Sequence, residues 1–153
     1  MSRNPARVAA GCCLVLAAVC CLGAVLARRS LVSVTVHGSS MEPTYRDGDR
    51  VLVRRGATPA PGHVVVAPLP TFTPGDAEGP PTRVVFTADH EGWLIKRVAS
   101  VPGDPVPGGR VPPGRVILLG DNSANSLDSR QIGYFPADAL LGVVLRRLPR
   151  VSR

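Results

Sequence analysis

The feature that most constrains this chain is a run of apolar residues near its N-terminus. Residues Val8 to Ala27 include no charged residue and no proline. As a helix, a run of this length would be about 30 Å long, which matches the hydrocarbon core of a bilayer. A secretory signal peptide usually has a shorter apolar region, and the pair Arg28 and Arg29 is not typical of a cleavage point. The run therefore predicts a retained transmembrane helix at 8–27, after a short tail at 1–7.

The charges around this run do not give its orientation. Arg3 and Arg7 precede the run, and Arg28 and Arg29 follow it. The positive-inside rule compares the basic residues on the two sides, and here the two sides are nearly equal. The sequence therefore predicts a single membrane crossing, but its flanking charges do not predict on which side of the membrane the C-terminal domain lies.

The overall charge and the cysteines exclude several function classes. The formal net charge is +7, carried almost entirely by arginine, and such a balance suits either nucleic acid or anionic lipid. There is no basic helix with interleaved aromatic residues and no zinc or helix-turn-helix pattern, so we expect a lipid bilayer and not a nucleic acid as partner. The cysteines all lie in the apolar run, so we expect no metal and no cofactor in the rest of the chain; they are Cys12, Cys13, Cys20 and Cys21.

Beyond the apolar run, short Val-rich segments alternate with turn signals such as Asp-Gly and Pro-Gly. This pattern is typical of short strands joined by tight turns. The residues Pro68 to Pro81 are rich in proline and are expected to form a loop. The sequence thus predicts a mainly β domain at 31–148 with a small folded-sheet or barrel-like architecture. The expected strands are Leu31–His37, Arg50–Arg55, His63–Ala67, Arg83–Thr87, Trp93–Ser100, Arg115–Leu119 and Leu141–Leu148.

Two residues in this domain are candidates for chemistry. Ser40 follows a predicted strand, where a hydroxyl can be held rigidly, although serines before prolines are also common in ordinary turns. Lys96, the only lysine in the sequence, lies inside the apolar strand segment Leu94–Val98. Burial lowers the pKa of a lysine and allows the neutral amine to act as a base towards a serine. The alternative is a lysine whose stem packs on the sheet while its ammonium group reaches water.

A third segment, from Gly120 to Gly133, is more polar than a surface turn requires. It follows the apolar residues Val116–Leu119 and includes Ser126, Asp128 and Arg130. Asp128 and Arg130 can pair across one residue, and the hydroxyl of Ser126 can orient a neighbouring amine. The segment is therefore a candidate support for the site.

These segments resemble the conserved boxes of the type I signal peptidases, and especially their short bacterial and mitochondrial inner-membrane members. The boxes occur in the order found in that family, over about Val32 to Leu148. They are S-M-x-P-T at Ser40–Thr44, a G-D-x-V-x-V-like region at Asp47–Val53, a strand at Gly62–Val66 with His63 where aspartate is more usual, I-K-R-V at Ile95–Val98 followed by P-G-D at Pro102–Asp104, and G-D-N-x-x-x-S-x-D-S-R-x-x-G at Gly120–Gly133.

The resemblance implies a membrane-bound serine endopeptidase with Ser40 as the nucleophile and Lys96 as the general base. Ser126 would hydrogen-bond the lysine amine, while Asp128 and Arg130 would brace the loop. Met41 belongs to the serine box and is taken as a supporting residue.

The family also suggests the oxyanion hole and the substrate cleft. The backbone N–H of Ser40 would donate to the oxyanion. Many members have a serine as second donor two residues before the nucleophile; here that position is Gly38. His37, Leu94 and Ile95 would line a cleft for an extended peptide.

The substrates implied are leader peptides of translocated preproteins. The location implied is the inner or cytoplasmic cell membrane, with the catalytic domain on the extracytoplasmic side.

Three other functions remain open at this point. One is a maturation protease dedicated to one or a few partner proteins, because the segment from Lys96 to Gly120 is too short for the second β subdomain of many members. Another is a catalytically silent, membrane-tethered β domain that binds peptides. The third is a Ser–His–Asp hydrolase that uses one of His37, His63 or His90, although none of them lies in a recognisable triad context.

Overall fold

The computed structural model describes residues 30–74, 82–85 and 92–149. The tail at 1–7 and the transmembrane helix expected at 8–27 lie outside the described residues. In the described part of the chain, no helix is both long enough and apolar enough to cross a membrane. The chain divides into two compact units, Met1–Leu31 and Val32–Arg153, and the fold described below is that of the second unit together with the start of its first strand.

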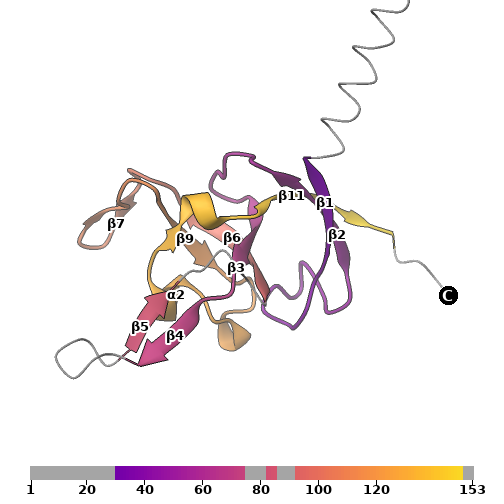
Figure 1. The fold of residues 1–153 in the computed structure, drawn as a ribbon, viewed down its shortest axis with the longest axis horizontal. Helices are drawn as coiled ribbons and strands as arrows, with labels where there is room; N and C mark the ends of the chain where they lie inside the picture. Colours follow the sequence, from indigo (N-terminus) through magenta and orange to yellow (C-terminus); the bar gives the residue numbers. More distant parts are fainter. Residues whose placement is uncertain (1–29, 75–81, 86–91, 150–153) are drawn as a thin grey trace, which may run out of the picture. The chain divides into compact units, whose positions relative to one another are not determined.

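The fold is built on one seven-stranded sheet with the strand order β1-β2-β11-β3-β6-β9-β10. Figure 1 shows this sheet strongly curled, with β1 and β2 turned away from β6 and β9. Each neighbouring pair from β2 to β10 is antiparallel. The strand bounds are β1 Leu31–Thr35, β2 Arg50–Arg55, β3 Val64–Pro68, β6 Trp93–Ser100, β9 Arg115–Leu119, β10 Phe135–Pro136 and β11 Gly142–Leu148.

Two small hairpins and three short helices complete the described part. The hairpins are β4 (Thr71–Pro74) with β5 (Thr82–Val85), and β7 (Pro105–Val106) with β8 (Gly109–Arg110). The helical turns are η1 (Ser123–Asn125), α2 (Ser129–Ile132) and η2 (Ala137–Ala139). The prediction of a mainly β domain is confirmed.

One expectation about the loops is wrong. The residues Pro68 to Pro81 were expected to form a loop, but Thr71–Pro74 is the strand β4, which pairs with β5. The alternating Thr-Phe-Thr sequence of β4 favours extended structure and finds a Val-rich partner in β5. The hairpin of β7 and β8 is a second element that the sequence did not suggest, because its strands have only two residues each.

Two hydrophobic clusters pack on opposite faces of the central strand β3, which is buried along its whole length. Because side chains alternate along a strand, Val64 and Val66 enter one cluster while Val65 and Ala67 enter the other. The first cluster also contains Val36, Met41, Val51, Val53 and Ile95. The second also contains Val98, Val116, Leu118, Phe135 and Val143. The neighbouring strand β6 contributes Ile95 to the first cluster and Val98 to the second, and Lys96 lies on this strand opposite Val65.

We expect the substitution Gly142→Ala to destabilise the domain. Gly142 lies between Arg55 of β2 and Val66 of β3, and a Cβ atom there would come within 2.1 Å of the backbone oxygen of Arg54. Strands must separate to relieve that contact, at a cost of about 1–3 kcal/mol. Thermal unfolding of the full chain in neutral detergent, followed by circular dichroism, measures the loss. Leu145→Ala, on the same strand but half exposed, is the control, and equal midpoints for the two variants would contradict this packing.

Candidate active site

The site is centred on the contact between Ser40 and Lys96, which are 56 residues apart in the chain. The Nζ atom of Lys96 lies 2.7 Å from the Oγ atom of Ser40, within hydrogen-bond distance. Lys96 sits on β6 opposite Val65 of β3, and only 1% of its surface is exposed. Met41, directly after Ser40, is fully buried in the first cluster and fixes the start of the turn. The structure thus brings together the two residues that the sequence singled out.

The surroundings of Lys96 favour its neutral form. Burial is the largest influence and lowers the pKa of Lys96, because an ammonium ion loses hydration when it leaves water. The negative charge of Asp128 acts in the opposite direction and raises this pKa, while the positive charge of Arg130 lowers it. The net effect is a pKa below the ordinary value, so that a larger fraction of the amine is unprotonated at a given pH.

Asp128 is the centre of a hydrogen-bonded network beside Lys96, and its surface is fully buried. Its Oδ2 atom accepts hydrogen bonds from Ser126 Oγ at 2.7 Å and from the Gly120 N–H at 2.8 Å. The guanidinium of Arg130 binds both carboxylate oxygens, at 2.9 and 2.6 Å. Burial alone would raise the pKa of Asp128, but the hydrogen bonds from Arg130, Gly120 and Ser126 hold it well below the usual range of a carboxyl group.

The local sequence explains why this loop has its shape. Asp128 is the N-cap of α2 and forms a capping box with Gln131, so the carboxylate is fixed by backbone geometry as well as by Arg130. The hydroxyl of Ser129 accepts a hydrogen bond from the Leu118 N–H at 2.8 Å and ties α2 to β9. The expected pairing of Asp128 with Arg130 is therefore present, with a salt bridge of 2.6 Å.

Ser126 takes part in the site differently from the expectation. The sequence reading had its hydroxyl bound to the amine of Lys96, but Ser126 Oγ donates to Asp128 instead. Ser126 still borders the turn that contains Ser40: a Cβ atom on Gly120 would lie 2.1 Å from Ser126 Oγ and 2.7 Å from the backbone oxygen of Ser40. Only glycine fits at position 120, which lets the two segments approach. The sequence reading did not identify this role of Gly120.

A second set of contacts joins the turn that contains Ser40 to the loop after β9. The N–H of Asn122 donates to the Ser40 carbonyl at 3.0 Å, and its side-chain amide donates to the Ser39 carbonyl at 3.1 Å. Arg97, next to Lys96, binds Asp121 through two hydrogen bonds of 2.8 and 2.7 Å. These residues were missed as site residues, although Asp121 and Asn122 lie in the polar segment and Arg97 directly follows the lysine.

The remaining predicted site residues lie around this centre. His37 has an 82% exposed side chain, with Nδ1 3.9 Å from Asp47 Oδ1. The N–H of Gly38 donates to the same carboxylate oxygen at 2.8 Å. Gly38 has a φ of +81°, which favours glycine, so a serine in this position would be strained. Leu94 is half-buried on β6, whereas Ile95 is buried in the first cluster.

Neither His37 nor His63, the histidines in the described part of the chain, takes part in the contact at Ser40. His37 faces solvent and Asp47, and His63 is exposed at the start of β3. His90 lies outside the described residues. The hydroxyl of Ser40 is bound by an amine and not by an imidazole. Among residues 30–74, 82–85 and 92–149, there is also no group of three or more His, Cys, Asp or Glu side chains that could hold a metal ion.

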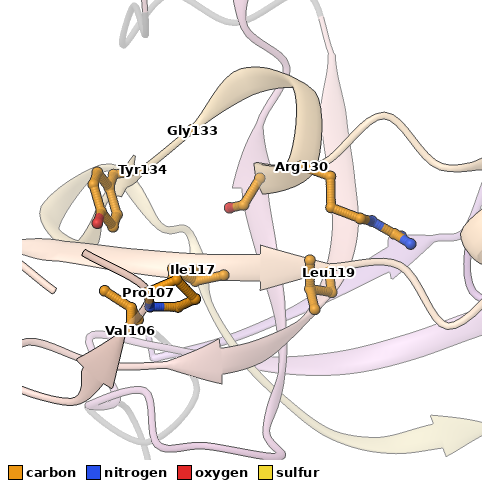
Figure 2. A pocket seen from close by; sticks show the side chains of 8 residues that line it. Val106, Pro107, Ile117, Leu119, Arg130, Gly133 and Tyr134 are labelled. Atoms are coloured by element: carbon orange, nitrogen blue, oxygen red, sulfur yellow. The ribbon is translucent and has the colours of Figure 1, made fainter. Parts of the chain in front are cut away.

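A mainly apolar pocket, separate from the contact between Ser40 and Lys96, has Arg130 among its lining residues (Figure 2). Its volume is about 250 Å³. In Figure 2, Val106 and Pro107 face Ile117 on β9, while Tyr134 lies at one end and Arg130 at the other. Neither Ser40 nor Lys96 lines this pocket, and its link to the site is the guanidinium that also binds Asp128.

A family model described as signal peptidase, peptidase S26, matches residues 9–108 and 105–148, which is most of the chain. This chain belongs to the signal peptidase family. It is similar to the probable signal peptidase I-2 of Synechocystis sp., with 28% identity over 151 residues that cover 76% of this chain and 64% of that protein. The chain thus spans less than two thirds of the length of that signal peptidase.

We expect Asp128→Asn to destabilise the domain by about 2–3 kcal/mol near neutral pH, because Arg130, Ser126 and Gly120 lose a charged acceptor. The folded-state pKa of Asp128 is lowered, so its stabilising effect is present above the unfolded-state value of about 3.9 and fades as the pH falls below it. Urea unfolding of both proteins from pH 7 to pH 3 tests this. The difference in stability should shrink in acid, and a constant difference would contradict the assignment.

Proposed function

We propose that this protein is a membrane-bound serine endopeptidase that cleaves leader peptides from translocated preproteins. The observation that carries the proposal is the 2.7 Å contact between the hydroxyl of Ser40 and the amine of Lys96, a buried residue and the only lysine in the chain. Membership of the signal peptidase family supports the same reaction class. The catalytic unit proposed is the domain at 31–148, and the apolar run at 8–27 is its anchor.

In this proposal, Lys96 is the general base for Ser40. The neutral amine accepts the hydroxyl proton as Oγ attacks the carbonyl carbon of the scissile peptide bond. The resulting ammonium ion then gives a proton to the leaving amine, and the leader remains as an ester on Ser40. Water, deprotonated by the same amine, hydrolyses that ester and releases the leader. The lowered pKa of Lys96 supports this role, because the base must be unprotonated to begin.

The other residues have supporting roles. The Ser40 N–H donates to the developing oxyanion. The hydroxyl hydrogen of Ser126 is directed at Asp128, so its oxygen keeps lone pairs free to accept from the lysine amine when Ser40 carries the acyl group. Gly38 has no hydroxyl to serve as a second oxyanion donor, and its positive φ argues against introducing one.

The substrate and the location complete the proposal. His37 and Leu94 flank the site and support binding of an extended leader segment in the cleft. The anchor makes the protein a single-pass protein of the inner or cytoplasmic membrane. Its catalytic domain faces the extracytoplasmic side, where preproteins emerge after translocation.

Protease treatment of intact spheroplasts tests on which side of the membrane the catalytic domain lies. We expect the added protease to digest the domain, and full protection of the domain would contradict the proposed orientation.

We expect Ser40→Ala and Lys96→Arg each to lower the cleavage rate of a preprotein at least about a thousandfold. Alanine lacks the nucleophile, and arginine keeps its proton at all working pH values. For the wild type, the rate should rise with pH through the lowered pKa of Lys96 and fall in mild acid. The assay is preprotein turnover by the full chain in detergent, from pH 5 to pH 10.

Ser123→Ala is the matched control, since Ser123 is an exposed serine in the same polar loop. It should cleave at the wild-type rate. Near-normal turnover by Lys96→Arg with an unchanged pH profile would rule out the lysine as base. Binding of the preprotein without cleavage by the wild type would favour the peptide-binding alternative.

A further inference from the structure

A second hollow lies beside the turn that follows Ser40. We call it the Arg46 hollow; it has a volume of about 520 Å³ and is lined by Pro43, Arg46, Asp49, Arg147, Leu148 and Pro149. It thus lies between the nucleophile turn and the C-terminal end of β11. Nothing in the mechanism above uses these residues.

Among the charged side chains that line the Arg46 hollow, the guanidinium of Arg46 is the one that could pair with a bound anion. Asp49 is almost fully buried; it accepts a hydrogen bond from the backbone N–H of Arg46 at 2.9 Å and pairs with Arg147 at 3.3 Å. The negative charge of Asp49 is therefore balanced by Arg147. The side chain of Arg46 is exposed and forms no ion pair with any acidic residue of the described part of the chain. A bound anion could pair with Arg46 without displacing an existing partner.

The neighbouring strands add to the positive potential. The strands β1, β2 and β11 contain five arginines and no aspartate or glutamate. These arginines are Arg50, Arg54, Arg55, Arg146 and Arg147. An excess of arginine over acidic residues in neighbouring strands attracts anionic partners. The Arg46 hollow adjoins one of these strands, since Arg147 and Leu148 of β11 line it.

The hollow is physically joined to the nucleophile turn. The guanidinium of Arg147 donates a hydrogen bond to the carbonyl of Thr44 and lies 5.2 Å from the centre of the Tyr45 ring. The Tyr45 N–H in turn donates to the carbonyl of Met41 at 2.9 Å, one residue after Ser40. The hollow thus adjoins the turn that carries Ser40, and its lining begins at Pro43, three residues further along the chain.

We propose that the Arg46 hollow binds an acidic side chain of the preprotein, located just after the scissile bond. The inference rests on the proposed function for the nature of the substrate. In the proposed function the leader before the bond lies beside His37 and Leu94, so the residues that follow the bond would lie towards the hollow, which is lined by Pro43 and Arg46 after Ser40 in the chain. An anionic lipid is the less suitable occupant, because a flat headgroup layer would meet the exposed Arg54 and Arg146 rather than a recess in the turn.

The test is peptide binding by the full chain carrying Ser40→Ala, in neutral detergent at low salt, which does not require cleavage. The probes are fluorescent peptides with alanines before the bond and Glu, Gln or Lys at one of the first four positions after it. A second set carries Glu or Gln before the bond instead, and the measurement is repeated in anionic nanodiscs. At one of these positions the Glu peptide should bind about 3- to 10-fold more tightly. The preference should weaken with added salt.

Arg46→Gln, in the same background, should remove the Glu preference, and Arg46→Glu should shift it towards a Lys peptide. Arg54→Gln is the control, because it removes the same charge from the neighbouring strand β2 and should keep the preference. Equal dissociation constants for Glu and Gln peptides would overturn the inference. If Arg54→Gln lost the Glu preference as fully as Arg46→Gln, that would also overturn the inference. The preference would then come from the overall positive charge of the domain and not from the hollow. A preference confined to residues before the bond, or one seen only in anionic nanodiscs, would overturn it as well. Cleavage of the same peptides by the wild type separately tests the proposed function.

Discussion

The burial of Lys96 at hydrogen-bond distance from Ser40 is the interaction on which the rest of the domain depends. A buried ammonium ion is costly, and that cost favours the neutral amine that a base requires. The curled sheet contributes to this burial, because Lys96 lies on the inner strand β6 opposite the fully buried Val65 of β3. Residues that support the site therefore also support the fold, and Met41 shows this most directly by packing in the first cluster next to Ser40.

Asp128 sets a limit on how far the pKa of Lys96 can fall. Its negative charge favours the ammonium form, but Arg130 binds both carboxylate oxygens and offsets this influence. The network thus holds Ser126 and Gly120 without leaving an unpaired carboxylate beside Lys96. Arg130 influences the pKa of Lys96 by its own charge and by pairing with Asp128, which explains why an arginine with a 40% exposed side chain belongs to a buried site.

Much of this could be predicted from the sequence, because the signals were local or carried by ordered motifs. The strand segments follow from alternation, and the pairing of Asp128 with Arg130 follows from their short spacing. Ser40 and Lys96 were open candidates on their own residues, and the resemblance of the ordered boxes to the signal peptidases paired them. Contacts between distant segments could not be predicted. The amide of Asn122 meets the carbonyl of Ser39, 83 residues away, and no local pattern indicates that partner. Ser126 was assigned to Lys96, whereas the carboxylate two residues further along the chain takes its hydrogen.

The most direct test of this account is the pKa of Lys96 itself. Because Lys96 is the only lysine, lysine labelled with carbon-13 at Cε gives a single side-chain signal in the full chain, without any assignment step. Its chemical shift, followed by NMR from pH 5 to pH 12 in the Ser40→Ala variant to prevent self-cleavage, reports protonation of the amine. The account predicts a midpoint clearly below the reference value of about 10.4 for an exposed lysine. A midpoint at or above that value would mean that the amine is protonated at working pH, and it would contradict the role of Lys96 as the base.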